Sequence, residues 1–289
     1  MSNNITNILI FGASGMLGSA LMKHFIKKKE FNVYGTVRSK SSVENCSALF
    51  LSRCLYNIDV ELEKDIDTAF SKAKPDIVIN CIGLVKQLSE SNDPLSVLPI
   101  NSLLPHKLSK MCASNKARLI HFSTDCVFSG KKGMYKESDN PDAIDLYGIS
   151  KYIGEVADKH CITLRTSIIG HELNGNRSLI DWFLGEEGSI NGFKKAIFSG
   201  LPTKEIANII ENFVIPFPEL HGLYHLSAKP IDKYKLLSMV ANIYSKKIDI
   251  MEDNDYKIDR SLNSQRFREI TGYEPPEWLA LINKMHENK

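Results

Sequence analysis

A tyrosine and a lysine four residues apart, Tyr147 and Lys151, form the only Tyr-x-x-x-Lys pattern in the 289-residue sequence. On a helix, residues four apart share one face, so both side chains could act on one small molecule. A phenol with its ordinary pKa of about 10 is a poor proton shuttle, but an ammonium one helical turn away favours its ionised form. The pair is therefore a candidate for proton transfer at a carbonyl oxygen, with a solvated surface pair as the alternative.

A glycine-rich turn precedes this pair by more than a hundred residues. The apolar run Ile8 to Phe11 is followed at once by Gly12-Ala13-Ser14-Gly15-Met16-Leu17-Gly18 and a helical stretch through Lys28. The first glycine permits a tight turn, the second lets the backbone approach a pyrophosphate, and the third lets the helix pack on its strand. The segment predicts a dinucleotide site with contacts at Gly12, Ser14, Gly15, Met16 and Leu17.

The second predicted strand, Phe31 to Val37, ends in Arg38 instead of the acid that NAD sites normally carry. A guanidinium suits the 2′-phosphate of NADP, so the sequence favours NADP, with NAD and an ordinary surface arginine left open. Further cofactor contacts are predicted near the ends of the next two strands, at Asp59, Val60, Cys81, Ile82 and Gly83. Asp59 fits a plain loop equally well.

The remaining elements place polar residues around the same region. A helix is predicted over 94–115 and contains Asn101, either as a cap or kink residue or as an organiser of water near the catalytic pair, and we expect Asn101 to contact the cofactor. The strand 118–123 leads to Thr124 at its carboxyl end, where open parallel sheets bind ligands. A polar loop over 129–146 then borders the substrate and leads to a helix from Tyr147 through Lys159.

Strands and helices alternate through a sixth strand at 161–165, which predicts an α/β fold with a doubly wound parallel sheet, a Rossmann fold. We expect residues 1–167 to form a dinucleotide-binding domain. Residues 168–289, where glycines interrupt the rhythm, are expected to form a smaller substrate-binding α/β lobe. Within that lobe, the strand and helix around 222–244 could return to the main sheet, and a short strand (247–251) and a terminal helix (277–287) follow.

Composition narrows the function classes. The sequence is 43% apolar and 24% charged with a net charge of +2, so it lacks the one-sided field of a nucleic-acid-binding protein. No apolar run reaches the roughly 18 residues of a membrane span. The six cysteines lack C-x-x-C spacing and no secretory leader is evident. We therefore expect a cytoplasmic protein with reduced thiols and no metal site.

Together these residues describe a carbonyl reductase. Hydride would pass from a nicotinamide to the carbonyl carbon while Tyr147 supplies a proton to the oxygen. Thr124 would fix that oxygen, and Lys151 could also hold a cofactor ribose hydroxyl.

The chain resembles the extended short-chain dehydrogenase/reductases over nearly its whole length, most closely the dTDP-4-dehydrorhamnose reductase-like group. The matching motifs are Gly12-Ala-Ser-Gly15-Met-Leu-Gly18, Ser123-Thr124-Asp125-Cys126-Val127-Phe128, Tyr147-Gly-Ile-Ser-Lys151 and Leu262-Asn263-Ser264 before an Arg266-Phe267 helix. The resemblance implies a Thr124, Tyr147 and Lys151 catalytic set and substrate contacts at Thr124, Asp125 and Cys126. It also implies NADPH-dependent reduction of a 4-keto-6-deoxy nucleotide sugar for surface polysaccharide or deoxysugar biosynthesis, with a homodimer as an allowed assembly.

The group usually has tyrosine where this chain has Cys126, so the sequence names a substrate class and leaves dTDP, UDP and GDP sugars open. Related 4,6-dehydratases carry Thr-Asp-Glu, which this chain lacks. A 4-epimerase would keep Thr124, Tyr147 and Lys151 but usually retains NAD, and Arg38 argues against it. A third alternative is a non-catalytic cofactor-binding regulatory subunit, similar to the partner of methionine adenosyltransferase, against which the complete Tyr147 and Lys151 pair speaks.

Overall fold

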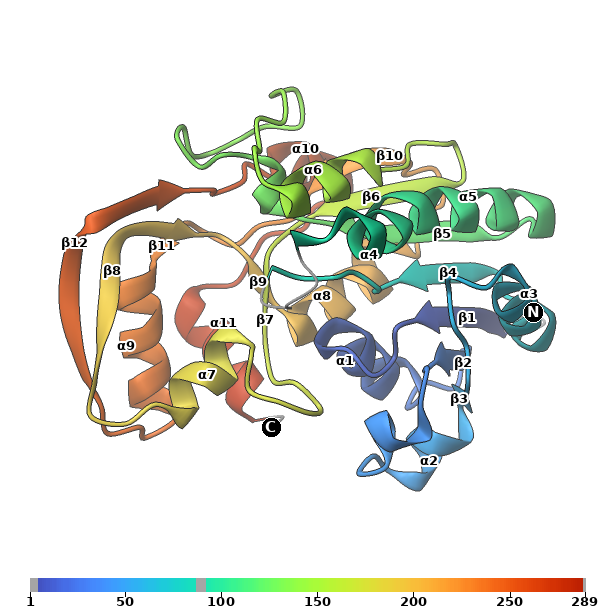
Figure 1. Cartoon of the computed structure of the whole chain (residues 1–289), viewed down its shortest axis with the longest axis horizontal. Coiled ribbons are helices and arrows are strands. Elements are labelled where there is room, and N and C mark those ends of the chain that lie inside the picture. Colours follow the sequence, from blue (N-terminus) through green and yellow to red (C-terminus); the bar gives the residue numbers. More distant parts are fainter. Residues whose placement is uncertain (1–4, 87–91, 288–289) are drawn as a thin grey trace. The chain divides into compact units, whose positions relative to one another are not determined.

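The computed structural model describes residues 5–86 and 92–287, and strands alternate with helices along most of the chain (Figure 1). By their contacts the residues form two compact units that interleave along the sequence. Unit 1 comprises Met1–Ser123, Asp145–Leu164 and Glu219–Leu223, and unit 2 comprises Thr124–Ile144, Arg165–Pro218 and Tyr224–Lys289. The assignment of a dinucleotide-binding role to residues 1–167 stays a prediction.

The main sheet has seven strands in the described part of the chain, in the order β10-β6-β5-β4-β1-β2-β3. The order turns back between β1 and β4, and β3, β2, β1, β4 and β5 pair in parallel. This arrangement confirms the predicted doubly wound Rossmann fold. The strands are β1 (Thr6–Phe11), β2 (Phe31–Thr36), β3 (Cys54–Leu55), β4 (Ile77–Asn80), β5 (Arg118–Ser123), β6 (Cys161–Arg165) and β10 (Gly222–His225).

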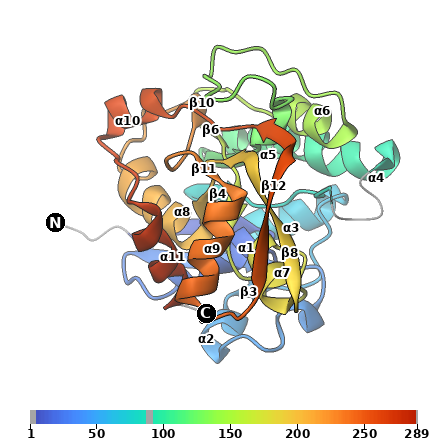
Figure 2. The ribbon, with the colours of Figure 1, turned by 90° about the vertical axis from the view of Figure 1, so that its left-hand side faces the viewer.

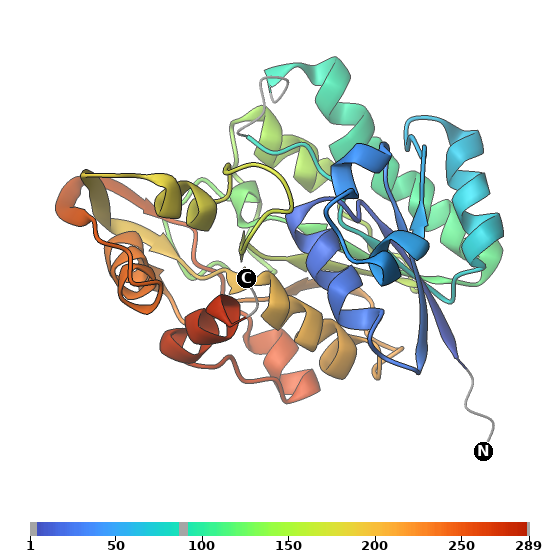
Figure 3. The same cartoon turned by 90° about the horizontal axis from the view of Figure 1, so that it is seen from below.

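Helices cover both faces of this sheet because alternate strand residues point to opposite sides. On one face, Leu9 and Phe11 of β1 pack in a core with α3 (Glu63–Ala73) and α5 (Leu104–Asn115). On the other face lies α1 (Met16–Phe25), whose Met22 sulfur approaches Gly35 of β2. Figure 3 shows α1, in dark blue, on the near side of the strands. The short helix α2 (Ala48–Ser52) lies between β2 and β3 in the sequence.

The helix predicted over 94–115 is present but irregular. It consists of α4 (Pro94–Leu98), a π-helical turn (Pro99–Leu103) and α5. Proline lacks the backbone N–H that a regular helix needs, so Pro99 and Pro105 account for the change of hydrogen-bond pattern. Asn101 lies in the π-helical turn.

The helix that carries the Tyr-x-x-x-Lys pattern is shorter than predicted. It is α6 (Leu146–Ile153), and its predicted continuation through Lys159 is wrong. Gly154 packs so closely that a Cβ atom there would overlap the carbonyl oxygen of Asn101. Beyond it, the backbone N–H and carbonyl of Val156 bond the Thr163 hydroxyl at 3.1 and 2.7 Å instead of continuing the helix.

Unit 2 is built around a separate three-stranded sheet, β11-β8-β12 in the described residues. Figure 2 faces it and shows β8 beside β12 with α9 alongside. Its elements are β7 (Ile168–Ile169), α7 (Leu179–Gly185), β8 (Ser189–Phe198), β9 (Leu201–Pro202), α8 (Thr203–Ile209), a π-helical turn (Ile210–Val214), β11 (Ile231–Asp232), α9 (Lys233–Ile243), β12 (Asp249–Asp259), α10 (Gln265–Thr271) and α11 (Trp278–His286).

Strand β12 is longer than the predicted 247–251 because it continues along β8 through a bulge between Asp253 and Lys257. The helix predicted within 222–244 is α9, which begins at Lys233 because the two residues before it pair with β8. Among the described residues, no helix is long and apolar enough to cross a membrane.

Candidate active site

The glycine turn of unit 1 has the geometry of an anion-binding site. Gly12 has φ of +85°, and a Cβ atom on Gly18 would overlap the Gly12 carbonyl oxygen. Gly15 is the N-cap of α1 and makes no side-chain cap bond. No N-cap side chain therefore accepts a hydrogen bond from the first-turn N–H groups of this ten-residue helix, and these groups are suited to bind a diphosphate. Ser14 and Met16 beside it are half-buried and Leu17 is buried.

Arg38 lies on the surface two residues after the end of β2, next to a serine-rich turn. Ser39 caps that turn by accepting a hydrogen bond from the Ser41 backbone N–H at 3.2 Å. An exposed guanidinium with neighbouring hydroxyls fits a 2′-phosphate. Asp59 closes a local turn by accepting from the Glu61 N–H at 3.1 Å, and Val60 lies in the hydrophobic core. The predicted cofactor contacts at Asp59 and Val60 stay predictions.

The segment after β4 is held in place by Asn101. The Asn101 side-chain oxygen accepts from the Leu84 N–H at 2.9 Å, and its Nδ2 donates to the Leu84 carbonyl at 3.0 Å and to the Ser150 hydroxyl at 3.2 Å. A Cβ atom on Gly83 would lie 3.5 Å from Asn101 Oδ1 and 3.8 Å from Lys151 Nζ. The structure thus brings together Gly83, Asn101 and Lys151. Cys81 and Ile82 before them are half-buried.

Helix α6 presents Tyr147 and Lys151 four residues apart. Its N-cap Asp145 accepts from the Gly148 N–H at 2.9 Å and pairs with Lys86 Nζ at 2.7 Å. The same Lys86 ammonium lies 5.6 Å from the centre of the Tyr147 ring. Lys86 could not be predicted as a site residue, because its approach to Tyr147 depends on the path of the chain after β4.

Lys151 is almost completely buried, with 5% of its surface exposed, and its Nζ donates to the Phe122 carbonyl oxygen at 2.7 Å. Burial lowers the pKa of Lys151 to about 8, while the Glu155 carboxylate and Cys81 act in the opposite direction. An ammonium with this pKa can lose or keep its proton close to neutral pH.

Thr124, in unit 2, follows the last residue of β5 and is buried. Its hydroxyl accepts from the Cys126 N–H at 3.1 Å and donates to Asp125 Oδ1 at 3.2 Å. These bonds cap the short turn Asp125–Val127 and fix the rotamer of Thr124. The three predicted substrate contacts therefore form one rigid turn.

Lys233, at the start of α9, is a candidate that the sequence did not reveal. Burial lowers the pKa of Lys233, and the neighbouring Asp125 and Cys126 oppose that shift. A partly buried cation thus lies beside the turn that follows Thr124, a placement that only the fold of unit 2 creates.

The loop after that turn is fixed by a buried aromatic and polar cluster. The Phe128 and Tyr135 rings stack with centroids 4.1 Å apart, and the Arg165 guanidinium lies 5.1 Å from the Phe128 ring centre. His225 Nδ1 lies 3.0 Å from the Tyr135 carbonyl oxygen. Burial, together with the Arg165 charge, lowers the pKa of His225 to about 3, so His225 is neutral at physiological pH.

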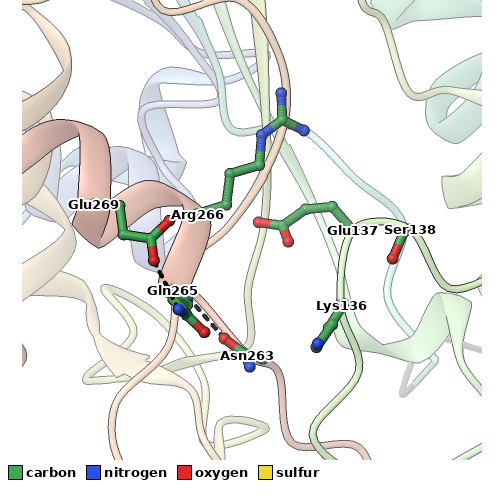
Figure 4. A pocket seen from close by; sticks show the side chains of 7 residues that line it. All are labelled: Lys136, Glu137, Ser138, Asn263, Gln265, Arg266 and Glu269. Atoms are coloured by element: carbon green, nitrogen blue, oxygen red, sulfur yellow. Dashed lines mark hydrogen bonds between the residues drawn. The ribbon is translucent and has the colours of Figure 1, made fainter.

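A polar pocket of about 270 Å³ lies between this loop and α10 in unit 2 (Figure 4). Gln265 donates to Glu269 at 2.7 Å, and Glu137 accepts from the His225 N–H at 2.9 Å. Two basic and two acidic side chains balance, so the pocket has no strong preference for an anion. Its lining residues are Lys136, Glu137, Ser138, Asn263, Gln265, Arg266 and Glu269, none of which is a predicted site residue.

One group of side chains in unit 1 has the composition of a metal site. The ligand atoms of Asp158, His160 and Cys161 lie within 4.8 Å of one another. The Ser109 hydroxyl occupies the space among them, 2.6 Å from Asp158 Oδ2, 3.3 Å from His160 Nε2 and 3.2 Å from Cys161 Sγ. Hydrogen bonds to this hydroxyl therefore account for the cluster without an ion.

Two known proteins illustrate the sequence similarity of this chain to others. A probable low-salt glycan biosynthesis reductase of Haloferax volcanii is 29% identical over 149 residues, which is 51% of this chain and 47% of that protein. Against this relative the match spans about half of either chain. Methionine adenosyltransferase 2 subunit beta of Xenopus laevis is 27% identical over 259 residues, covering 82% of this chain and 72% of that one.

Among solved structures, the dTDP-4-dehydrorhamnose reductase of Bacillus anthracis in complex with NADP superposes with a TM-score of 0.79. The match covers 98% of this chain and 99% of the other at 20% sequence identity, so it establishes a shared fold. The sequence model of the family described as RmlD substrate binding domain matches residues 6–288. Since that match includes almost every residue, the chain belongs to the RmlD substrate binding domain family.

Proposed function

We propose that the protein is an NADPH-dependent reductase of the 4-keto group of a 4-keto-6-deoxy nucleotide sugar, acting in surface polysaccharide or deoxysugar biosynthesis. The observation that carries this proposal is the buried Lys151, fixed by the Phe122 carbonyl at 2.7 Å one helical turn from Tyr147. Burying a cation costs folding free energy, and residues with pKa values shifted in this way cluster at functional sites.

The glycine turn and Arg38 support NADPH as the cofactor. The α1 N-terminus without a side-chain cap fits the diphosphate, and exposed Arg38 fits the 2′-phosphate. The Bacillus anthracis reductase of the same fold is in complex with NADP. NAD stays the alternative, to be decided by measuring KM for both cofactors.

Each catalytic residue has a distinct task in this proposal. Bound NADPH supplies the hydride that the carbonyl carbon accepts. Tyr147 donates the proton to the carbonyl oxygen, and the Lys151 ammonium stabilises the phenolate left behind. The Thr124 hydroxyl exchanges its Asp125 acceptor for the carbonyl oxygen and so orients it.

The substrate class is proposed from the family and from the names of two proteins similar to this chain, a dTDP-4-dehydrorhamnose reductase and a probable glycan biosynthesis reductase. A ligand that binds only the folded protein raises its melting temperature by mass action. A panel of dTDP, UDP and GDP sugars with NADP present should therefore contain one class that raises Tm above the others. If no 4-keto nucleotide sugar supports NADPH oxidation, the reductase proposal fails.

A non-catalytic regulatory subunit is the second candidate, because methionine adenosyltransferase 2 subunit beta matches over 82% of this chain. This candidate predicts NADPH binding without oxidation and a changed rate of a methionine adenosyltransferase partner. An epimerase would instead retain its nucleotide through purification and interconvert sugars without net NADPH consumption. Absorbance of the purified protein and the stoichiometry of NADPH use separate the three.

We further propose a cytoplasmic homodimer. Helix α6 exposes Ile149, Tyr152 and Ile153 by 39, 48 and 50%, beside a groove of about 440 Å³ in the same unit. A second copy would cover this apolar face. Replacing Ile153 with Lys should shift the mass in solution from dimer to monomer, and an unchanged mass would contradict this face as the interface. None of the six cysteines, all of which lie in the described residues, forms a disulfide, which suits a reducing compartment.

A further inference from the structure

Glu155 is tied to the strand end that precedes Thr124. It lies four residues after Lys151, just beyond the end of α6, and its carboxylate accepts a hydrogen bond from the Ser123 hydroxyl at 2.7 Å. Lys151 holds the carbonyl of the preceding residue, Phe122, also at 2.7 Å. Two charged residues four apart thus bind two consecutive residues at the end of β5.

Within the described part of the chain, few charged groups face the buried Lys151 ammonium. Directly after β4 comes Cys81, whose thiol pKa is raised by burial and which is therefore neutral. From β5 comes His121, whose pKa is held well below its usual value by burial and then by the charges of Lys151 and His106. From just beyond its own helix comes Glu155, and Tyr147 lies one turn earlier on that helix. Of these groups, a carboxylate is the one that is anionic at neutral pH.

We propose that Glu155 is a positioning residue for the reduction: its carboxylate keeps Lys151 charged and, through Ser123, fixes the strand end that leads to Thr124. This role rests on the proposed reductase function. It also explains why a carboxylate accompanies a lysine whose other contacts are neutral, because an unpaired buried charge is strongly disfavoured.

The pKa of Lys151 is close enough to neutral pH for one nearby carboxylate to change the protonation state of the lysine. With a pKa of about 8, Lys151 is mostly charged at neutral pH, and the Glu155 charge works against the dominant effect of burial. Without that charge, Lys151 would lose its proton within the working pH range and could no longer stabilise the Tyr147 phenolate.

The experiment compares Glu155→Gln, which keeps the shape and removes the charge, with Ser123→Ala, which keeps the charge and removes the hydrogen bond. The pKa of Lys151 is followed by NMR titration of the lysine side chain in the protein without ligands, and the pH profile of kcat/KM is measured with NADPH. We expect E155Q to move both the Lys151 titration and the alkaline limb to lower pH by roughly one pH unit. S123A should lower turnover and leave the limb in place.

An unmoved Lys151 titration in E155Q overturns the proposal, even if turnover falls, because a merely structural role predicts that pattern. A limb that moves equally in S123A overturns it as well. If E155Q does not fold, Glu155→Asp must move the titration in the same direction by a smaller amount, and no movement counts against the role. The NMR titration needs no substrate, so its outcome is independent of whether the protein is a reductase.

Discussion

The Lys151 side chain donates a 2.7 Å hydrogen bond to the carbonyl oxygen of Phe122, which joins helix α6 to the end of strand β5 within unit 1. The helix carries Tyr147, and the chain continues from β5 through Ser123 to Thr124. One buried cation therefore fixes the element with the proposed proton donor to the strand that leads to the proposed carbonyl contact. The effect of this buried cation on the free energy of unfolding and its effect on turnover can both be measured.

Replacing Lys151 with Met should stabilise the protein at neutral pH while removing turnover. The fall of the Lys151 pKa from 10.5 to about 8 corresponds to a folding cost of about 3 kcal/mol for the charged form. The lost hydrogen bond to Phe122 offsets about 1 to 2 kcal/mol of that gain. Chemical unfolding at pH 7 should therefore show K151M to be more stable by about 1 to 2 kcal/mol.

The pH dependence of that difference has a definite sign. Below pH 8 both folded and unfolded wild-type chains hold the Lys151 proton, so the full cost is present. Between pH 8 and 10.5 the folded chain releases the proton first, which relieves the cost and stabilises the wild type relative to K151M. A K151M variant that is less stable than wild type at pH 7 would contradict the burial cost.

Turnover should fall as the pH rises through about 8, because the ammonium that stabilises the Tyr147 phenolate is then lost. The measurement is kcat/KM with NADPH in constant ionic strength from about pH 6 to about pH 10. A profile that stays flat to the alkaline end would mean that the charge of Lys151 does not contribute to the rate.

Much of unit 1 could be predicted from the sequence. Strands β5 and β6 have the predicted bounds, because each is a short segment with three apolar residues. The glycine turn could also be predicted, because the positive φ of Gly12 and the close approach of Gly18 to the Gly12 carbonyl oxygen both require glycine.

What the sequence could not show depends on tertiary packing. The end of α6 at Ile153 follows from the close approach of Gly154 to Asn101, fifty residues earlier in the chain. Strand β8 was not predicted because exposed and buried residues alternate imperfectly along it. The hydrogen bond between Ser123 and Glu155 could not be predicted either, although the sequence shows that Glu155 lies four residues after Lys151.

Replacement by Ala should lower stability at Gly18 and NADPH binding at Gly15. A Cβ atom on Gly18 would overlap the Gly12 carbonyl oxygen, whereas on Gly15 it would meet the same oxygen at an ordinary 3.5 Å. Gly18→Ala should therefore cost about 2 kcal/mol or more of stability. Gly15→Ala should keep Tm within about 4 °C of wild type and weaken NADPH binding. Thermal unfolding and fluorescence titration distinguish them, and equal losses of Tm would contradict the assigned roles.

Arg38 should set the preference between cofactors. Because it is exposed, Arg38→Ala should leave Tm unchanged. Loss of a charge-assisted hydrogen bond to the 2′-phosphate should raise the KM for NADPH roughly tenfold or more, with little effect on NADH. Lys40→Ala, an exposed cation two residues away, serves as the control. An unchanged KM for NADPH in R38A would remove the structural basis for preferring NADP.

The most direct test of the proposed reductase is Tyr147→Phe, measured for NADPH oxidation with the active 4-keto nucleotide sugar and for NADPH binding. The removed hydroxyl is the proposed proton donor, so kcat/KM should fall at least about 100-fold, while the Kd for NADPH stays within about threefold of wild type. Tyr152→Phe, at an exposed position on the same helix, should keep wild-type turnover. Undiminished turnover in Y147F would contradict the assignment of Tyr147 as the proton donor.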